Sequence, residues 1–310
     1  MLGTVWMGWA MQFVCWVMLG KALLPAAMKF MSAHGLTDRN YRGESIPTSG
    51  GLMIWLLLVC QALWYKLAAA FGLTEAAMGT GAASLAEKLP VSLAGAASMV
   101  ALAGFIDDTV GHKAYKGFAG HFRLWKERRV ISTGAVKAGA TGIAALWIIV
   151  PEGGGSGAGP AVLGLALQWL LIGLTTNAIN LLDTRPGRAL KGFALIAAVL
   201  LAVMAASANK EGFGGGIIPS LLPVIAACAV LAQPDLKGEL MLGDTGSNLL
   251  GFLLGAWIAL CFGWKLQAAA VLLLAGLHAV TWRLSLSKLI ERNRFLQWVD
   301  WLGRDTAGKI

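Results

Sequence analysis

Long apolar runs separated by short polar segments dominate the sequence. The runs cover approximately residues 4–31, 49–71, 91–106, 134–150, 161–180, 193–208, 218–232, 248–263 and 267–282. A helix needs about 20 predominantly apolar residues to cross a bilayer, and each run approaches that length. The pattern therefore predicts an all-α fold, a polytopic membrane helix bundle of about nine transmembrane helices.

The composition agrees with a membrane protein. Of the 310 residues, 57% are hydrophobic and only 13% are charged, whereas soluble domains carry about 25% charged residues. The four cysteines lie inside the apolar runs and form no CxxC pair, so they indicate neither a disulfide framework nor a zinc site. The Gly/Ser/Pro stretch 151–160 has polar clusters on both sides and is interpreted as an outer loop. We therefore expect one integral membrane domain over residues 1–310.

Charged residues are distributed unequally between alternate connections. The connections that follow the odd-numbered runs hold 19 of the 25 Lys and Arg residues, counting Lys137 just inside the fourth run. Because cytoplasmic loops are enriched in Lys and Arg, the N-terminus is predicted to lie outside and the C-terminus in the cytoplasm. Twelve of the 16 acidic residues share this face. Such a face suits an anionic, metal-bound ligand or anionic lipid headgroups, and no nucleic-acid-binding motif is present.

Two adjacent acids end the third run. Asp107 and Asp108 repel each other, and a basic stretch that includes Lys116 follows them. Mg²⁺ binds carboxylate oxygens, keeps several waters and bridges to phosphates, so it would remove this repulsion. A solvated loop in which the acids pair with neighbouring bases is the alternative.

Two further polar clusters lie at the same predicted face. Gly50 and Gly51 precede the second run, where exposed backbone N–H groups can meet phosphate oxygens, although a simple turn explains them as well. Asn177, Asn180 and Asp183 are spaced three apart and therefore share one side of a helix near its inner end. Ordinary placement of polar residues at the membrane interface is the alternative, but this stripe on an apolar helix favours a site.

The fourth cluster places Asp244 between glycines, directly before the eighth run. An ordinary helix cap explains this residue alone. Together, however, the clusters bring Asp107, Asp108, Asp183 and Asp244 to one face from different helix ends, and Lys137 lies at the same depth. Acids for a metal and a lysine for phosphate at a membrane surface predict phosphoryl transfer involving a lipid.

Five segments resemble, in the same order, the signatures of the polyprenyl-phosphate N-acetylhexosamine-1-phosphate transferases, the superfamily that includes phospho-N-acetylmuramoyl-pentapeptide transferase. The segments are PTSGG, GFIDD, STGAVK, NAINLLD and GDTGS. The resemblance implies a multi-pass enzyme of the inner (plasma) membrane with its active site facing the cytoplasm. In the implied reaction, polyprenyl phosphate attacks the β-phosphate of a UDP-sugar, UMP is released, and polyprenyl-diphospho-sugar remains.

The resemblance also implies roles for individual residues. Asp107 would be the base or phosphate-side acid, with Asp108 as its partner and Lys137 holding the diphosphate. Asp244 would be the main ligand of Mg²⁺, for which Mn²⁺ can substitute, with Asp107 as a second ligand. Asp183 would complete the catalytic group beside the metal and the nucleotide. Substrate contacts are expected from glycine, amide and basic positions of the same face, namely Gly50, Gly51, Lys116, Asn177, Asn180 and Arg283.

Two departures from the family pattern leave other functions open. The segment DTRPG has Pro186 where the family often has a second acid. The tail 283–310, which we expect to be a cytoplasmic amphipathic segment, has no histidine where many members carry a His-rich motif. The alternatives are a non-catalytic homologue and a membrane transporter of a lipid-linked or anionic substrate, although transporters usually place charge near the midplane. The oligomeric state is open, with a homodimer as one option.

Overall fold

Helices account for nearly all of the residues that the computed structural model describes, which are 2–73, 83–110, 131–150, 158–206 and 217–304. The long helices are α1 (Leu2–Ala33), α2 (Gly51–Ala70), α4 (Ala83–Val110), α6 (Thr133–Ile149), α7 (Ala158–Leu182), α8 (Arg188–Ala206), α10 (Ile217–Lys237), α11 (Gly243–Cys261) and α12 (Trp264–Arg283). Seven helices in the described ranges are long and apolar enough to cross a membrane, which fits a multi-pass membrane protein. Because α6 is shorter and α8 is not among the seven, nine crossings stay a prediction.

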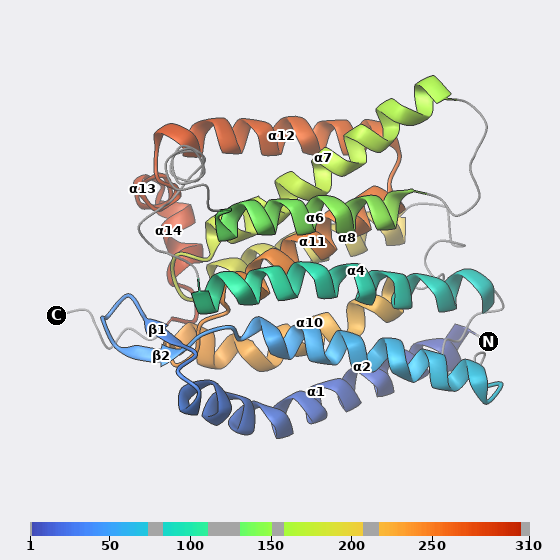
Figure 1. The fold of residues 1–310 in the computed structure, drawn as a ribbon, viewed down its shortest axis with the longest axis horizontal. Coiled ribbons are helices and arrows are strands. Elements are labelled where there is room, and N and C mark those ends of the chain that lie inside the picture. The colour runs from blue at the N-terminus through green and yellow to red at the C-terminus, as the bar shows by residue number, and fades with distance from the viewer. Residues whose placement is uncertain (1, 74–82, 111–130, 151–157, 207–216, 305–310) are drawn as a thin grey trace.

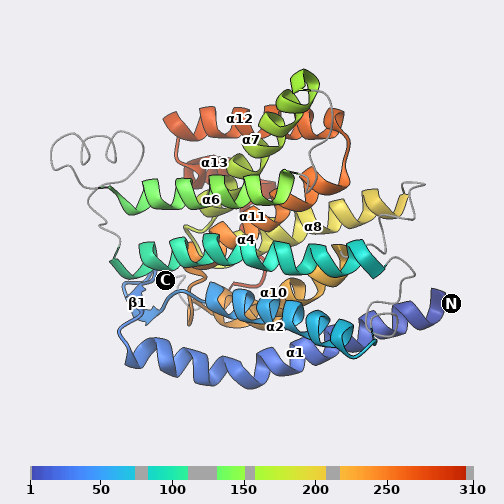
Figure 2. The ribbon, with the colours of Figure 1, turned by 45° about the vertical axis from the view of Figure 1, so that its right-hand side comes forward.

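The long helices run between two ends of the bundle (Figure 1). At one end, α4 and α7 finish and α2, α6 and α11 begin, so the four predicted polar clusters share this end. The turned view in Figure 2 keeps this arrangement, with α1 and α2 on one side of the bundle and α12 on the opposite side. We call the shared end the polar end. Its assignment to the cytoplasm rests on the charge distribution alone.

A short β-hairpin at the polar end was not expected from the sequence. β1 (Thr37–Arg39) pairs antiparallel with β2 (Ser45–Pro47) between α1 and α2. The side chain of Asn40 accepts hydrogen bonds from the backbone of Arg42 and Glu44, and it donates to the carbonyl of Gly238 at 3.1 Å. The hairpin is therefore closed by its own turn and fastened to the segment that follows α10.

The described part of the tail, residues 283–304, contains two short helices. These are α13 (Leu286–Arg292) and α14 (Arg294–Trp301). Asn293 separates them, because its side chain accepts hydrogen bonds from the first backbone N–H groups of α14 and caps that helix. In α14, Asp300 is buried whereas Phe295 and Trp298 are exposed, and an amphipathic role of the tail at the membrane stays a prediction.

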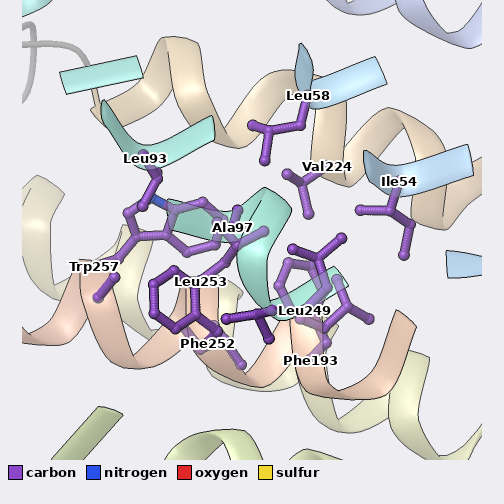
Figure 3. Close-up of a cluster of buried hydrophobic side chains, with 14 of the residues drawn as sticks. Ile54, Leu58, Leu93, Ala97, Phe193, Val224, Leu249, Phe252, Leu253 and Trp257 are labelled. Atoms are coloured by element: carbon purple, nitrogen blue, oxygen red, sulfur yellow. The ribbon is translucent and has the colours of Figure 1, made fainter. Parts of the chain in front are cut away.

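The core of the bundle is built around α11. Every residue from Thr245 to Ala259 is buried, and the helix contacts α2, α4, α6, α7 and α8. Figure 3 shows apolar side chains from α2, α4, α8, α10 and α11 packed together, among them Ile54, Leu58, Leu93, Ala97, Phe193, Val224, Leu249, Phe252, Leu253 and Trp257. The position of α11 is thus fixed from several sides, and so is the acid that it carries in its first turn.

Two glycines allow α11 to approach α7 closely. A Cβ atom at Gly251 would lie 2.6 Å from the Cα atom of Thr176, and one at Gly255 would lie 2.7 Å from the Cα atom of Ile172. Small residues four apart let membrane helices pack backbone against backbone, which matters because lipid tails are as apolar as the side chains. This contact fixes α11 against the helix that carries the asparagine stripe.

Substitution at this contact is expected to be costly. Gly251→Ala should lower the melting temperature of the detergent-solubilised protein, because the added methyl group meets backbone atoms that cannot rotate away. Overpacking of this kind typically costs about 1–3 kcal/mol. Gly276→Ala in α12 is the matched control, since a Cβ atom there has nothing within 4 Å. Equal melting temperatures for the two variants would contradict the close contact between α7 and α11.

Candidate active site

Lys137 joins two carboxylates that come from different helices. Its Nζ atom, in α6, lies 2.5 Å from Oδ2 of Asp107 near the end of α4 and 2.5 Å from Oδ2 of Asp244 in the first turn of α11. The side chains of Lys137, Asp107 and Asp244 are 17%, 19% and 27% exposed, so a ligand can reach them from the polar end. The structure therefore gathers three of the predicted site residues around one point.

Asp108 points to the beginning of α11. Its Oδ1 atom accepts a hydrogen bond from the backbone N–H of Asp244 at 2.8 Å. Its Oδ2 atom accepts from the backbone N–H and the hydroxyl of Thr245, at 3.0 and 2.5 Å, and from the hydroxyl of Ser49 at 2.9 Å. A carboxylate in this place satisfies free N–H groups and interacts favourably with the helix dipole. Asp108 thus connects α4 to α11 and fixes Asp244.

The two hydroxyl residues that hold Asp108 were not identified as site residues from the sequence. Ser49 and Thr245 are fully buried, and Ser49 has a positive φ of 63°, which is rare outside glycine. Each lies within a segment that the sequence singled out, PTSGG and GDTGS. The signal was therefore present, but the hydroxyls were overlooked beside the glycines and the acid.

Close backbone approach explains the glycines beside the acids. Gly243 has a φ of +72°, and a Cβ atom there would lie 2.6 Å from Oδ2 of Asp108. A Cβ atom at Gly104 would lie 2.5 Å from the carbonyl oxygen of Asp244. Larger residues at either position would separate α4 from the start of α11 and open the acidic cluster.

The backbone N–H groups of Gly50 and Gly51 are not exposed for phosphate as the sequence predicted. The N–H group of Gly50 donates to the carbonyl of Met241, and that of Gly51 donates to the carbonyl of Leu242, both at 3.0 Å. A Cβ atom at Gly51 would also lie 2.1 Å from the backbone nitrogen of Gly246. The two glycines therefore let α2 begin against α11, and their amides are already used within the protein.

The asparagine stripe of α7 is divided in the structure. Oδ1 of Asn180 accepts a hydrogen bond from the hydroxyl of Ser247 at 3.2 Å, so this side chain faces α11. Asn177, one turn earlier, is exposed. The shared helix side predicted for these two residues thus does not give them the same surroundings, and Asn180 is the one held beside the acidic cluster.

Asp183 lies directly after the last residue of α7. Asn180, three residues earlier, bonds Ser247 near the start of α11, and the pKa of Asp183 is affected by the backbone N–H of Gly243, so Asp183 lies near the start of α11. Burial raises the pKa of Asp183 well above its ordinary value, and the negative charges of Asp235, Asp244 and Asp108 raise it further. These surroundings therefore shift Asp183 toward its protonated form, and a cation bound among these carboxylates would shift it back toward the ionised form.

Two basic residues, Lys116 and Arg283, were also predicted to contact the substrate. Lys116 is outside the described residues. Arg283 is the last residue of α12 and is exposed. Within the described part of the chain, no ion pair joins Arg283 to the acids, and a substrate contact by either basic residue stays a prediction.

The donor set at Lys137 fits a hard divalent cation. The oxygens of Asp107 and Asp244 converge on one cationic point, and carboxylate oxygens are the ligands that Mg²⁺ prefers. Among the described residues, no group of three or more His, Cys, Asp or Glu side chains is arranged to hold a metal ion. Mg²⁺ commonly uses one or two carboxylates and completes its shell with water and substrate phosphates, so two acids suffice. Lys137 occupies the point between them, which makes its ammonium group a competitor for the same oxygens.

The region that contains this cluster matches a known protein family. Residues 90–262, more than half of the chain, match the sequence model of glycosyl transferase family 4. No curated protein matches the chain. The matched region includes Asp107, Lys137, Asp183 and Asp244, whereas the hairpin and the tail lie outside it.

Proposed function

The chain belongs to glycosyl transferase family 4, and from this premise we propose that it transfers a sugar-1-phosphate from a UDP-sugar to polyprenyl phosphate and releases UMP. The proposed sugar is an N-acetylhexosamine, in keeping with the five sequence segments. The proposed location is the plasma membrane, with the polar end in the cytoplasm, where nucleotide sugars are available. The seven apolar helices provide the membrane part that a lipid substrate requires.

One observation carries the proposal, which is the meeting of Asp107 and Asp244 at Lys137 within the matched residues. Two carboxylates and one ammonium group at a membrane surface combine a site for a metal with a cation for phosphate. Phosphoryl transfer needs little covalent chemistry from the protein, because its transition state is stabilised mainly by positioning and charge neutralisation. The partly exposed arrangement suits this task better than a purely structural ion pair.

In the proposed reaction, an oxygen of the lipid phosphate forms a bond to the β-phosphorus of the UDP-sugar. The bond between that phosphorus and the bridging oxygen breaks, and UMP leaves with the oxygen. Asp107 accepts the proton of the lipid phosphate if that group is still protonated. Lys137 exchanges its contacts with the two acids for contacts with the diphosphate, whose negative charge it neutralises.

The remaining residues hold and border this centre. Asp244 and Asp107 would hold Mg²⁺, which neutralises and orients diphosphate oxygens when it is bound. Asp108 keeps Asp244 in place through the start of α11. Asp183 and Asn180 face the same helix start and are proposed to border the metal and the nucleotide.

Purified protein in nanodiscs tests this function directly. With undecaprenyl phosphate and Mg²⁺, a panel of UDP-sugars should yield UMP, with the highest rate for a UDP-N-acetylhexosamine. Chelation of divalent cations should stop the reaction, and Mg²⁺ or Mn²⁺ should restore it. Absence of UMP with every nucleotide sugar would count against the transferase, and substrate uptake into liposomes without UMP release would favour a transporter.

A further inference from the structure

A buried ion pair joins the tail to the polar end of the bundle. Arg188, the first residue of α8, is 5% exposed, and Asp300 of α14 is 8% exposed. Nε of Arg188 donates to Oδ1 of Asp300 at 2.7 Å, and Nη2 donates to Oδ2 at 2.9 Å. Such a bidentate pair is geometrically specific, and it links residues that are 112 positions apart in the chain.

A second arginine binds the same carboxylate. Arg304 donates from Nη2 to Oδ1 of Asp300 at 2.5 Å and from Nη1 to Oδ2 at 3.1 Å. Its Nε atom donates to the carbonyl of Pro186 at 2.8 Å, within the turn that follows Asp183. Pro186 is the residue that departs from the family pattern. Asp300 therefore binds Arg304, which contacts this turn directly.

The surroundings of Asp300 favour its charged form. Burial raises the pKa of Asp300, but the hydrogen bond from Arg188 and the positive charges of Arg304, Arg188 and Lys191 outweigh burial and lower the pKa. Lys191 contributes two further hydrogen bonds, to the backbone carbonyls of Val299 and Asp300 at 3.0 and 2.8 Å. Removing one partner of a buried charge pair leaves the other uncompensated, so loss of this carboxylate should release the contact.

The turn 183–187 is held by two more contacts. Nη1 of Arg188 donates to the hydroxyl of Thr184 at 3.2 Å. The backbone N–H of Gly187 donates to Oδ2 of the buried Asp235 in α10 at 2.8 Å, and Gly187 has a φ of +75°. The turn is thus fixed by α8, by α10 and, through the arginines at Asp300, by the tail.

We propose that Asp300 is a positioning residue for Asp183, so that the tail sets the geometry of a site that it does not enter. Asp183 is the first residue of the turn and directly follows the end of α7, where Asn180 bonds Ser247 near the start of α11. Both oxygens of Asp300 are occupied by arginines, so Asp300 acts through the turn and not on the substrate. The inference rests on the proposed function, but it concerns a segment outside the residues that match the family.

Asp300→Asn in the full-length protein tests this role with two independent measurements. Hydrogen exchange, followed by mass spectrometry, should accelerate at the amides of Gly187, Arg188 and Lys191. These amides donate to Oδ2 of Asp235 and to the carbonyls of Arg185 and Gly187 in the turn. At a temperature well below melting, kcat for UMP release should fall about 10- to 100-fold, as expected for a misplacement of about 1 Å. KM for the lipid phosphate should stay within about twofold, and Asp300→Glu should restore part of kcat.

Glu291→Gln is the matched control, because it removes an exposed carboxylate from the same tail and should change neither measurement. Unchanged exchange in the turn of Asp300→Asn would overturn the proposal, and so would faster exchange with an unchanged kcat. If Asp300→Asn does not yield folded protein, Arg304→Gln removes the direct contact with Pro186 and is measured in the same way. A wild type that releases no UMP defeats the proposed function, whereas the exchange rates still decide whether Asp300 holds the turn.

Discussion

Asp244→Ala is expected to lower kcat for UMP release by about 10²-fold or more, because a lost metal ligand removes several kcal/mol of transition-state stabilisation. Asp244 is the residue best placed for this role. Its backbone is fixed by Asp108, its carboxylate is partly exposed, and Oδ2 converges with that of Asp107. Mg²⁺ binding in the absence of substrate, measured by competition with Mn²⁺ in electron paramagnetic resonance, should weaken in parallel.

The control for this variant is Glu239→Ala, which removes an exposed acid from the segment between α10 and α11. It should leave both kcat and cation binding unchanged. Because the backbone contacts of Asp108 with α11 do not involve the side chain of Asp244, the melting temperature of Asp244→Ala should remain close to that of the wild type. Full activity of Asp244→Ala would favour a homologue without catalytic function over the transferase.

The apolar pattern predicted the bundle well because burial in lipid constrains every turn of a helix. A spanning segment must satisfy its backbone hydrogen bonds internally, so long apolar runs become helices. The ends of the helices and their connections were less predictable. α4 continues to Val110, which places Asp107 and Asp108 inside its last turns and not after them. The hairpin after α1 is held by Asn40 and Gly238, a contact across 198 residues that local patterns do not contain.

The acidic cluster could be anticipated because each member lies at the end of an apolar run on the same predicted side of the membrane. The sequence did not show that these acids have different contacts. Asp107 and Asp108 are neighbours, yet one meets Lys137 and the other binds the start of α11, because their side chains leave the helix in different directions. The glycines of PTSGG were assigned to phosphate on a local argument, whereas packing against α11 uses their amides.

The role of the tail could not be read from its pattern. Its apolar spacing predicted an amphipathic segment, and on such a helix Asp300 is one polar residue among several. Only the folded chain places it beside Arg188 and Arg304. The absence of histidine in the tail left other functions open, whereas the contacts show that Arg304 of the tail reaches the turn after Asp183.

Lys137→Gln is expected to have the second large effect on kcat. It separates the two proposed functions of the cluster, which are metal binding and neutralisation of the diphosphate. The variant should lower kcat by about 10²-fold, because it removes the cation proposed to neutralise the diphosphate in the transition state. It should also strengthen Mg²⁺ binding in the absence of substrate, since Asp107 and Asp244 lose the ammonium group that occupies their converging oxygens. Asp244→Ala should lower both kcat and Mg²⁺ affinity, whereas Lys137→Gln should lower kcat and raise Mg²⁺ affinity.

The matched control is Lys237→Gln, an exposed lysine in the last turn of α10, which should alter neither property. Lys137→Arg is informative as well, because a planar guanidinium keeps the charge but cannot reproduce a point contact between two carboxylates. It should bind Mg²⁺ no better than the wild type while kcat remains reduced. In this proposal, kcat and Mg²⁺ affinity are coupled because Lys137 leaves the acids when it binds phosphate. A Lys137→Gln variant with unchanged Mg²⁺ affinity would therefore show that the lysine and the metal use separate oxygens.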